Sequence, residues 1–321
     1  MTATWDPRSS DIDVRADLER VEALLREHAD SDQRLARDAG AHLIAAGGKR
    51  FRPMLTLMTG FLGDGADPRL VPCAAAIELT HLATLYHDDV IDETSVRRGV
   101  PTVNVRFGNS VAVLAGDFLF ARASALAAGL GSYVARKLAE TIAVLCEGQI
   151  METSALGDLD VGAEHYLAVI ARKTGALIAT ACHLGARLSG APEELVTAAT
   201  TYGDALGMAF QIRDDILDIA GDEAESGKVP GTDLREGVLT LPALLTLDGT
   251  LPGGDTLRVA LGAKDHNGAL ELLRSNGSVE HSRAAVEDWM ARAHTALEPV
   301  PDGPARTALE GLAAFAGART A

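Results

Sequence analysis

Apolar residues recur every three or four positions along most of this chain, the spacing that places them on one face of a helix. No stretch alternates apolar and polar residues over a length that would suit a strand. The pattern predicts long helices at about residues 13–29, 32–46, 52–62, 69–93, 109–129, 131–156, 164–189, 192–221 and 279–298.

Clusters of glycine, proline and aspartate separate the predicted helices. They read AAGGKRFRP, RRGVPTVNVRFGN, GDEAESGKVPGTDLREG and GTLPGGD, and such clusters are typical of connections between helices. We therefore predict an all-α fold, a single domain over residues 1–321 that starts with a disordered tail at 1–12. About ten or more helices would form a bundle around a central cavity, because bundles build ligand sites in their interior from facing helices.

Composition narrows the class of protein. Of the 321 residues, 47% are hydrophobic, and no uninterrupted apolar run reaches the about 18 residues of a membrane span. The acidic N-terminal segment lacks the apolar stretch of a secretory signal. Cys73, Cys146 and Cys182 match no metal-binding spacing, so we expect them to be reduced. The net charge of −16 argues against a nucleic-acid partner. We expect a cytoplasmic protein in which basic clusters or metal ions bind any phosphate-bearing ligand.

The pattern D-D-x-x-D occurs twice, as DDVID from Asp88 and as DDILD from Asp214. Asp88 and Asp92 are four residues apart, as are Asp214 and Asp218, so each pair shares one face of a helix. Like charges at this spacing repel each other, and unpaired carboxylates on an inward face are costly. Mg²⁺ would offset both effects, because it prefers oxygen and is typically bound by one or two carboxylates plus substrate phosphates.

A solvated acidic surface is the alternative interpretation of a single D-D-x-x-D. Two copies, each on an otherwise apolar helix, favour a metal site instead. Basic residues also follow each copy closely: Arg97 and Arg98 after the first, Lys228 after the second. An acidic cluster, a cation and a basic loop together indicate a site for a diphosphate.

A further basic segment, GGKRFRP, carries Lys49, Arg50 and Arg52 where a helix is predicted to begin. Helix N-termini favour anions through free N–H groups and the helix dipole. Taken alone, this segment could equally be a solvated basic turn. Lys173 and Thr174 in ARKTGAL are a weaker signal, because such pairs are common on helix surfaces.

Taken in order, these motifs resemble the trans-polyprenyl diphosphate synthases. The order is GGKRFRP, H-x6-DDxxD-x4-RRG, GQ, KT, FQxxDDxxD and GKxxGTDLREG, in register over about residues 40–242. The resemblance implies the isoprenoid synthase fold and a homodimer. It also implies a Mg²⁺-dependent prenyltransferase that condenses isopentenyl diphosphate head-to-tail with an allylic diphosphate.

The resemblance implies roles for individual residues. Asp88 and Asp92 would bind two Mg²⁺ ions and Asp214 a third, supported by Asp89, Asp215 and Asp218. The expected ligands of the allylic diphosphate are Arg97, Lys173, Gln211 and Lys228. Those of isopentenyl diphosphate are Lys49, Arg52, His81 and Arg98, with Arg50 as a neighbour. Thr174 and Gln149 would stabilise the developing allylic cation or its surroundings, and the departing diphosphate would accept the proton lost from the adduct.

One position departs from the family pattern. Family members often read E-G-K-x-T-L-P after the second cluster, whereas this chain reads EGVLTLP with Val238 at the lysine position. We expect weaker binding of the allylic diphosphate, although the reaction would be retained. The loop at 222–238, which carries Lys228, is expected to close over the bound diphosphate.

Small residues below the first cluster bear on product length, which bulky side chains at these positions limit in the family. Ala83 and Thr84 are small, and Thr80 and Ile77 continue the same face without an aromatic ring. From Thr84 eleven residues back to Cys73, the helix covers about 16 Å at 1.5 Å per residue. This predicts a product of about C30 to C45. A C15 or C20 product is the alternative, since small residues also serve tight helix packing.

A terpene cyclase and a non-catalytic partner subunit are the two alternative functions. A terpene cyclase usually has a different second metal motif and an aromatic cavity that stabilises cations, and this chain is 4% aromatic. A non-catalytic partner subunit tends to lose aspartates from one cluster, and both clusters are intact here. The synthase is therefore the favoured interpretation.

Overall fold

The computed structural model describes residues 12–221 and 230–317. The predicted disordered tail at 1–12 lies outside the described residues except for Ile12, whose side chain is only 4% exposed. Lys228, and with it the part of the predicted closing loop at 222–229, also lies outside the described residues.

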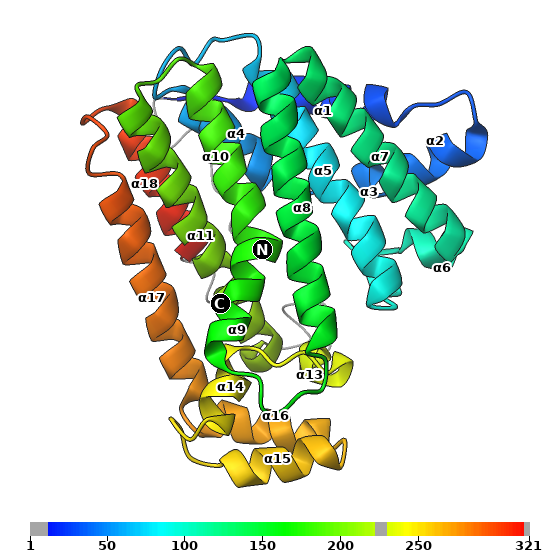
Figure 1. Cartoon of the computed structure of the whole chain (residues 1–321), viewed down its shortest axis with the longest axis vertical. Coiled ribbons are helices and arrows are strands. Elements are labelled where there is room, and N and C mark those ends of the chain that lie inside the picture. The colour runs from blue at the N-terminus through cyan, green and yellow to red at the C-terminus, as the bar shows by residue number, and fades with distance from the viewer. Residues whose placement is uncertain (1–11, 222–229, 318–321) are drawn as a thin grey trace.

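The described chain is almost entirely helical, which confirms the all-α prediction (Figure 1). Its strands, β1 (Val96–Arg97) and β2 (Val100–Pro101), form one short antiparallel hairpin that pairs Val96 with Pro101. The helices are α1 (Arg15–Ala29), α2 (Arg34–Gly40), α3 (His42–Ala45), α4 (Phe51–Gly60), α5 (Leu70–Ile91), α6 (Val103–Phe107), α7 (Asn109–Gly129), α8 (Ser132–Ser154), α9 (Ala163–Ile170), the π-helical turn η2 (Ala171–Gly175), α10 (Ala176–Leu188), α11 (Glu193–Ala220), α13 (Thr232–Glu236), α14 (Leu241–Leu247), α15 (Gly254–Gly262), α16 (His266–Ser275), α17 (Ser278–Ala296) and α18 (Pro304–Gly317).

The long helices run side by side, and the short ones α14, α15 and α16 gather at one end of the bundle (Figure 1). Helix α5 packs against α7, α4, α1 and α10, whereas α11 packs against α10 and α17. Each of the two aspartate motifs lies at the C-terminal end of its helix, the first on α5 and the second on α11.

Most predicted helices lie within a few residues of the observed ones, and two differences are informative. The segment 32–46 is broken at Ala41 into α2 and α3. The short helices α14, α15, α16 and α18 were not predicted. A segment of seven to ten residues such as α14 or α16 covers too few turns for its apolar spacing to stand out.

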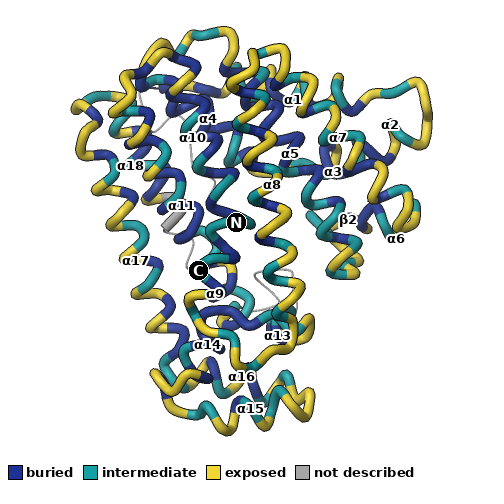
Figure 2. The backbone as a smooth tube through the Cα atoms, viewed as in Figure 1, coloured by how far each residue is buried: buried dark blue, intermediate teal, exposed yellow. Residues whose placement is uncertain are grey.

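Burial follows the predicted apolar stripes, with buried faces turned inward and exposed faces outward (Figure 2). Two segments, Asn109–Gly129 and Ala163–Leu188, are long and apolar enough to cross a membrane by length and composition alone. The second is more buried inside the bundle than the first, 56% against 33%. Since core helices often pass the same test, these segments are weak grounds for a membrane span.

Glycines allow three helices to meet closely around η2. A Cβ atom added at Gly148 of α8 would lie 2.8 Å from the backbone nitrogen of Lys173. One added at Gly207 of α11 would lie 2.7 Å from the Gly175 Cα. Side chains cannot occupy such distances without displacing backbone. The close approach therefore places Lys173, in η2, directly between α8 and α11.

We predict that Gly148→Ala lowers the free energy of unfolding by about 1–3 kcal/mol, the usual cost of overpacking. The added methyl group meets backbone rather than a flexible side chain, although alanine is the better helix former. Urea denaturation would measure the change. Gly129→Ala is the matched control, because a Cβ there meets no atom within 4 Å. A Gly148→Ala protein as stable as the wild type would contradict the close packing.

Candidate functional site

The first aspartate cluster lies where α5 ends. Asp88 and Asp89 belong to its last turn, and Asp92 follows the helix, with its backbone N–H donating to the Asp88 carbonyl over 2.8 Å. Burial raises the pKa of the Asp88 carboxyl to about 6, opposed by the charge of Lys173 and helped by that of Asp92. The carboxylates therefore face each other in a poorly solvated place, as their spacing predicts.

Asp89 is completely buried and anchors the hairpin that follows α5. Its carboxylate accepts a hydrogen bond from Arg97 Nε over 2.5 Å, and its backbone carbonyl accepts from the Asn104 side chain and the Thr94 N–H, each over 3.0 Å. These contacts hold the hairpin residues Arg97 and Arg98 beside the cluster. Asp89 thus lies where the predicted supporting role requires it.

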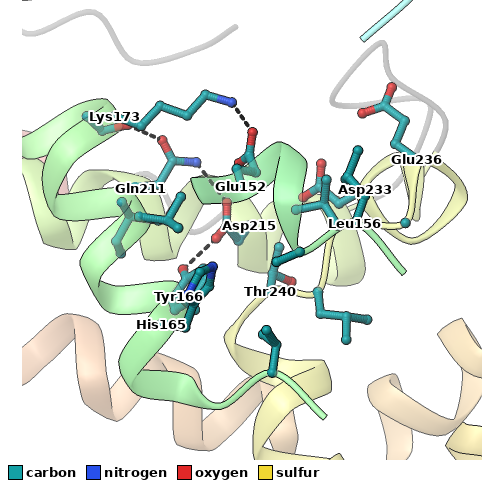
Figure 3. A pocket seen from close by; sticks show the side chains of 18 of the residues that line it. Glu152, Leu156, His165, Tyr166, Lys173, Gln211, Asp215, Asp233, Glu236 and Thr240 are labelled. Atoms are coloured by element: carbon teal, nitrogen blue, oxygen red, sulfur yellow. Dashed lines mark hydrogen bonds and ion pairs between the residues drawn. The ribbon is translucent and has the colours of Figure 1, made fainter. Parts of the chain in front are cut away.

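The second cluster lies near the end of α11. Asp214 is exposed, whereas Asp215 is buried. The Asp215 carboxylate accepts hydrogen bonds from the Tyr166 hydroxyl at 2.5 Å and the Gln211 amide at 2.8 Å (Figure 3). Burial raises the pKa of Asp215, and both hydrogen bonds oppose that rise. Tyr166 therefore fixes Asp215 in place from helix α9.

Asp218 is held by backbone groups. Its carboxylate oxygens accept from the N–H groups of Thr232 at 3.1 Å and Asp233 at 3.2 Å, at the start of α13. The Asp218 carbonyl also accepts from the Gly231 N–H at 2.8 Å. This aspartate therefore ties the segment after the second cluster to α11.

The six aspartates divide into two sets by their partners. The carboxylates of three accept hydrogen bonds from the protein and hold neighbouring segments: Asp89, Asp215 and Asp218. The other three make no side-chain hydrogen bond or ion pair within residues 12–221 and 230–317: Asp88, Asp92 and Asp214. The unpartnered set is the one expected to bind metal. Carboxylate oxygens of this kind are the ligands that Mg²⁺ prefers.

The unpartnered carboxylates do not complete a metal site by themselves. In the part of the chain that the structure describes, no three His, Cys, Asp or Glu side chains converge closely enough to hold an ion. An ion bound by one or two carboxylates would need further oxygens from water and a bound phosphate, which is the usual situation for Mg²⁺.

Lys173 lies between the two clusters and forms an ion pair with Glu152 of α8 (Figure 3). Burial alone would lower its pKa, but the negative charges of Glu152 and Asp88 outweigh burial and raise it. The next residue, Thr174, donates to Gln211 Oε1 over 2.7 Å. Lys173 is therefore a firmly charged cation beside a chain of hydrogen bonds that runs from Thr174 through Gln211 to the second cluster.

A cavity of about 160 Å³ opens beside these groups. Side chains from both clusters, from η2 and from the segment after α13 line it, among them Asp92, Glu152, His165, Tyr166, Lys173, Thr174, Gln211, Asp215, Asp233, Glu236, Val238 and Thr240 (Figure 3). Val238 lies on the wall where the family has lysine, so this wall is apolar here. Gln149 lies on α8 with its side-chain oxygen buried and unpartnered within the described residues.

Four basic side chains, which we call the basic group, lie around the start of α4 and on the neighbouring segments: Lys49, Arg52, His81 and Arg98. Arg98 donates to the carbonyls of Leu43, at 3.0 Å, and of Gly47. Burial lowers the pKa of Arg52 to about 10, with Glu78 opposing and Arg98 reinforcing the shift. Burial and the nearby arginines lower the pKa of His81 well below its usual value, so His81 is neutral at pH 7. Lys49 is exposed.

Arg50 was expected to lie next to the isopentenyl diphosphate, and the structure gives its side chain another use. The guanidinium is 6% exposed and is held by Glu22 of α1 and by Glu78 of α5, the latter over 3.0 Å. Two carboxylates therefore occupy the groups that would have met a phosphate.

The expected product-length residues lie in the core. Ala83, Thr80 and Ile77 are completely buried, whereas Thr84 is partly exposed. None of them lines the cavity of Figure 3. The structure therefore shows packed side chains along this face of α5.

Sequence reasoning missed several residues of the site: Glu22, Glu78, Glu152, Tyr166 and Glu236. The sequence did hold a spacing signal for three of them. Glu152 follows Gln149 by three residues and Tyr166 precedes Lys173 by seven, so each shares a helix face with a residue that was identified. Glu78 likewise precedes His81 by three residues on one predicted helix, whereas Glu22 gave no such signal, because its partner Arg50 is distant in the sequence.

Comparison with known proteins gives a consistent result. The family described as polyprenyl synthetase matches residues 33–272. A nonaprenyl diphosphate synthase of Mycobacterium tuberculosis is 44% identical, over 95% of this chain and 93% of that protein. A decaprenyl diphosphate synthase structure from Rhodobacter capsulatus superimposes with a TM-score of 0.88 at 40% identity, covering 95% of this chain and 97% of that one.

A second structure is similar at comparable identity. It is a geranylgeranyl pyrophosphate synthase from Corynebacterium glutamicum complexed with calcium and isoprenyl diphosphate, with a TM-score of 0.82 and 42% identity over 95% of this chain and 96% of that one. With the family match, these similarities over nearly the whole length are decisive. The chain belongs to the polyprenyl synthetase family.

Proposed function

We propose that this protein condenses isopentenyl diphosphate head-to-tail with an allylic diphosphate to make an all-trans polyprenyl diphosphate. The observation that carries the proposal is the division of the six aspartates. The carboxylates of Asp88, Asp92 and Asp214 form no hydrogen bond or ion pair within the described residues, whereas those of Asp89, Asp215 and Asp218 each accept at least one hydrogen bond. A scaffold that holds three carboxylates and leaves three without partners is suited to binding divalent cations together with a diphosphate.

The allylic diphosphate would lie between the two clusters. Bound Mg²⁺, with three ions expected, would supply positive charge that stabilises the departing diphosphate. Lys173 and Arg97 would bind the same group, and their attraction to it would grow as negative charge develops on it. Both side chains lie beside the first cluster, where Arg97 pairs with Asp89 and Lys173 faces the charge of Asp88. Lys228 has this role by resemblance, and its position is outside the described residues. Thr174 and Gln211 present polar groups beside Lys173.

Isopentenyl diphosphate would bind at the basic group formed by Lys49, Arg52, His81 and Arg98. Because His81 is neutral, it would contribute a hydrogen bond, and the arginines and Lys49 would contribute the charge. The double bond of isopentenyl diphosphate attacks the allylic cation, forming a carbon–carbon bond. The adduct then loses a proton to the departing diphosphate.

The proposed product length is about C30 to C45. Ala83 and Thr80 are small, and the relatives include a nonaprenyl synthase with nine isoprene units in its name. The relatives also include a geranylgeranyl pyrophosphate synthase at similar identity, so a short C15 or C20 product is the alternative. A non-catalytic partner subunit is the alternative of another class, and the complete aspartate clusters count against it.

The function is tested by incubating the protein with labelled isopentenyl diphosphate, Mg²⁺ and, separately, C5, C10, C15 and C20 allylic diphosphates. We expect dephosphorylated products of C30 or longer by chromatography. Asp214→Asn should lower kcat at least about 100-fold, since a lost metal ligand costs several kcal/mol of transition-state stabilisation. Asp302→Asn is the control, because its side chain is 97% exposed before α18 and lies outside the site.

The outcomes separate the alternatives. Products that stop at C15 or C20 would keep the function and refute the interpretation of Ala83 and Thr84. Folded protein that elongates none of the four primers would overturn the synthase in favour of a partner subunit.

We also propose a homodimer in the cytoplasm, formed through the outer face of α7 and α8. Three large apolar side chains are exposed there: Val113 at 40%, Leu114 at 66% and Ile150 at 67%. A second copy would cover this apolar face. Light scattering should give twice the 33.5 kDa chain mass, and Leu114→Glu should reduce it to that of one chain. A wild-type protein of single-chain mass would refute the dimer.

The pKa of Asp88 predicts how pH affects the metal-free protein. Burial raises it to about 6 and also raises those of Asp92 and Asp215 above their usual values. An acid with a higher pKa in the folded than in the unfolded state stabilises the fold when protonated. That stability is present below the unfolded pKa of about 4 and is lost as pH rises through about 6.

We therefore expect the metal-free protein in EDTA to unfold more easily at about pH 7 than at about pH 5 in urea titrations. Mg²⁺ with inorganic pyrophosphate should restore stability at the higher pH, because both bind the folded state. Asp88→Asn should flatten the dependence in EDTA. Equal midpoints at the two pH values would show that these carboxylates are not destabilised by burial.

A further inference from the structure

A buried carboxylate lies among the arginines of the basic group. Glu78, on α5 three residues before His81, is 2% exposed and pairs with Arg50 Nη1 over 3.0 Å. Arg50 pairs in turn with Glu22 of α1 and donates to the Ile44 carbonyl over 3.4 Å. A buried charge is tolerated only when it is paired, so these three residues form one network that joins α1, the start of α4 and α5.

The network holds a strained backbone. Arg50 has a φ of 48°, in the left-handed region that non-glycine residues rarely adopt, and it directly precedes α4. Such a conformation persists where surrounding contacts determine it. The pairs with Glu22 and Glu78 provide those contacts, and Lys49 and Arg52 lie on either side of the fixed residue.

The same network reaches Arg98. A Cβ added at Gly48 would lie 2.9 Å from Nη1 of Arg50 and 2.9 Å from Nη1 of Arg98, so the two guanidinium groups flank this glycine. Arg98 has a φ of 54° and donates to the Gly47 and Leu43 carbonyls. Both guanidinium groups therefore lie against the glycine loop, and Arg98 is hydrogen-bonded to it. We call these contacts of Arg50 and Arg98 the clamp.

Glu78 is the common counter-charge of this group. Burial lowers the pKa of Arg52 and Arg98, and the negative charge of Glu78 opposes that lowering. At Arg50, the charges of Glu22 and Glu78 outweigh burial and raise the pKa. The positive charge of Arg98 lowers the pKa of Arg52, and the positive charge of Arg50 lowers the pKa of Arg98. Without an anion, these cations would repel each other when no substrate is bound.

We propose that Glu78, together with Arg50 and Glu22, positions Lys49, Arg52 and Arg98 to bind the diphosphate of isopentenyl diphosphate. The proposal rests on the proposed function, because it takes this basic group to be the site of that substrate. Arg50 is then a positioning residue, while the diphosphate is bound by the three cations around it.

Glu78→Gln distinguishes two effects of Glu78 on the KM for isopentenyl diphosphate: positioning of the cations, and repulsion between its carboxylate and the diphosphate. Loss of the first would raise this KM, and loss of the second would lower it. Removing a negative charge near a diphosphate site would by itself tighten binding. Loss of the clamp would instead misplace the cations. We expect KM for isopentenyl diphosphate to rise at least about tenfold, with KM for the allylic diphosphate and kcat changed by less than about threefold.

Two further variants test the same network. Arg50→Lys keeps the charge, but its compact ammonium group cannot span both carboxylates, so it should raise the same KM. Glu22→Gln removes a partner that is 26% exposed, so it should raise this KM less than Glu78→Gln does. It replaces Glu78→Gln in the test if that variant does not fold. Glu310→Gln, which breaks an exposed pair with Arg306 on α18, is the matched control and should change neither KM.

The KM values of Glu78→Gln decide whether Glu78 has a positioning role. An unchanged or lower KM for isopentenyl diphosphate in Glu78→Gln, or an equal rise in both KM values, would overturn the positioning role. Should the wild type fail to turn over, the proposed function fails, and calorimetry with inorganic pyrophosphate still tests the clamp. Weaker pyrophosphate binding by Glu78→Gln than by the wild type would support it, and equal or tighter binding would refute it.

Discussion

Repulsion among carboxylates is the constraint that organises the centre of this molecule. Acids from α5, α8, α11 and α13 surround one cavity, and several of them have pKa values raised by burial and by one another. The fold offsets the repulsion locally. Arg97 pairs with Asp89, Tyr166 with Asp215, backbone N–H groups with Asp218, and Lys173 with Glu152. What remains unpartnered within the described residues is a small set of carboxylate oxygens, and that set is the proposed cation site.

The basic group around the start of α4 meets the inverse constraint. There the arginines would repel each other, and a buried glutamate, Glu78, supplies the opposite charge. The two groups therefore share one design, in which each excess charge is partly neutralised by a scaffold residue and the remainder is left for a ligand. Mg²⁺ with a diphosphate would neutralise the excess negative charge of the aspartate clusters, and a second diphosphate would neutralise the excess positive charge of the basic group.

The sequence predicted the fold class, the long helices and the two aspartate clusters, because helical periodicity and the D-D-x-x-D repeat are local signals. Helical periodicity could not show which aspartates are held by the scaffold, since that depends on Tyr166 and on the backbone at Thr232, and only the resemblance assigned the supporting roles. The pairing of Arg50 with two carboxylates was not predicted for the same reason. Its partners Glu22 and Glu78 are each 28 residues away, and no short-range pattern links them.

Product length depends on how α5 packs against its neighbours. Ala83, Thr80 and Ile77 are small or branched side chains, yet they are completely buried and none of them lines the cavity beside the aspartates. A hydrocarbon chain that grows along this face must therefore displace neighbouring side chains, because protein interiors are close-packed. Small residues lower the cost of that displacement without providing an open channel. The product length proposed here therefore depends on how far the helices around α5 yield to the growing chain.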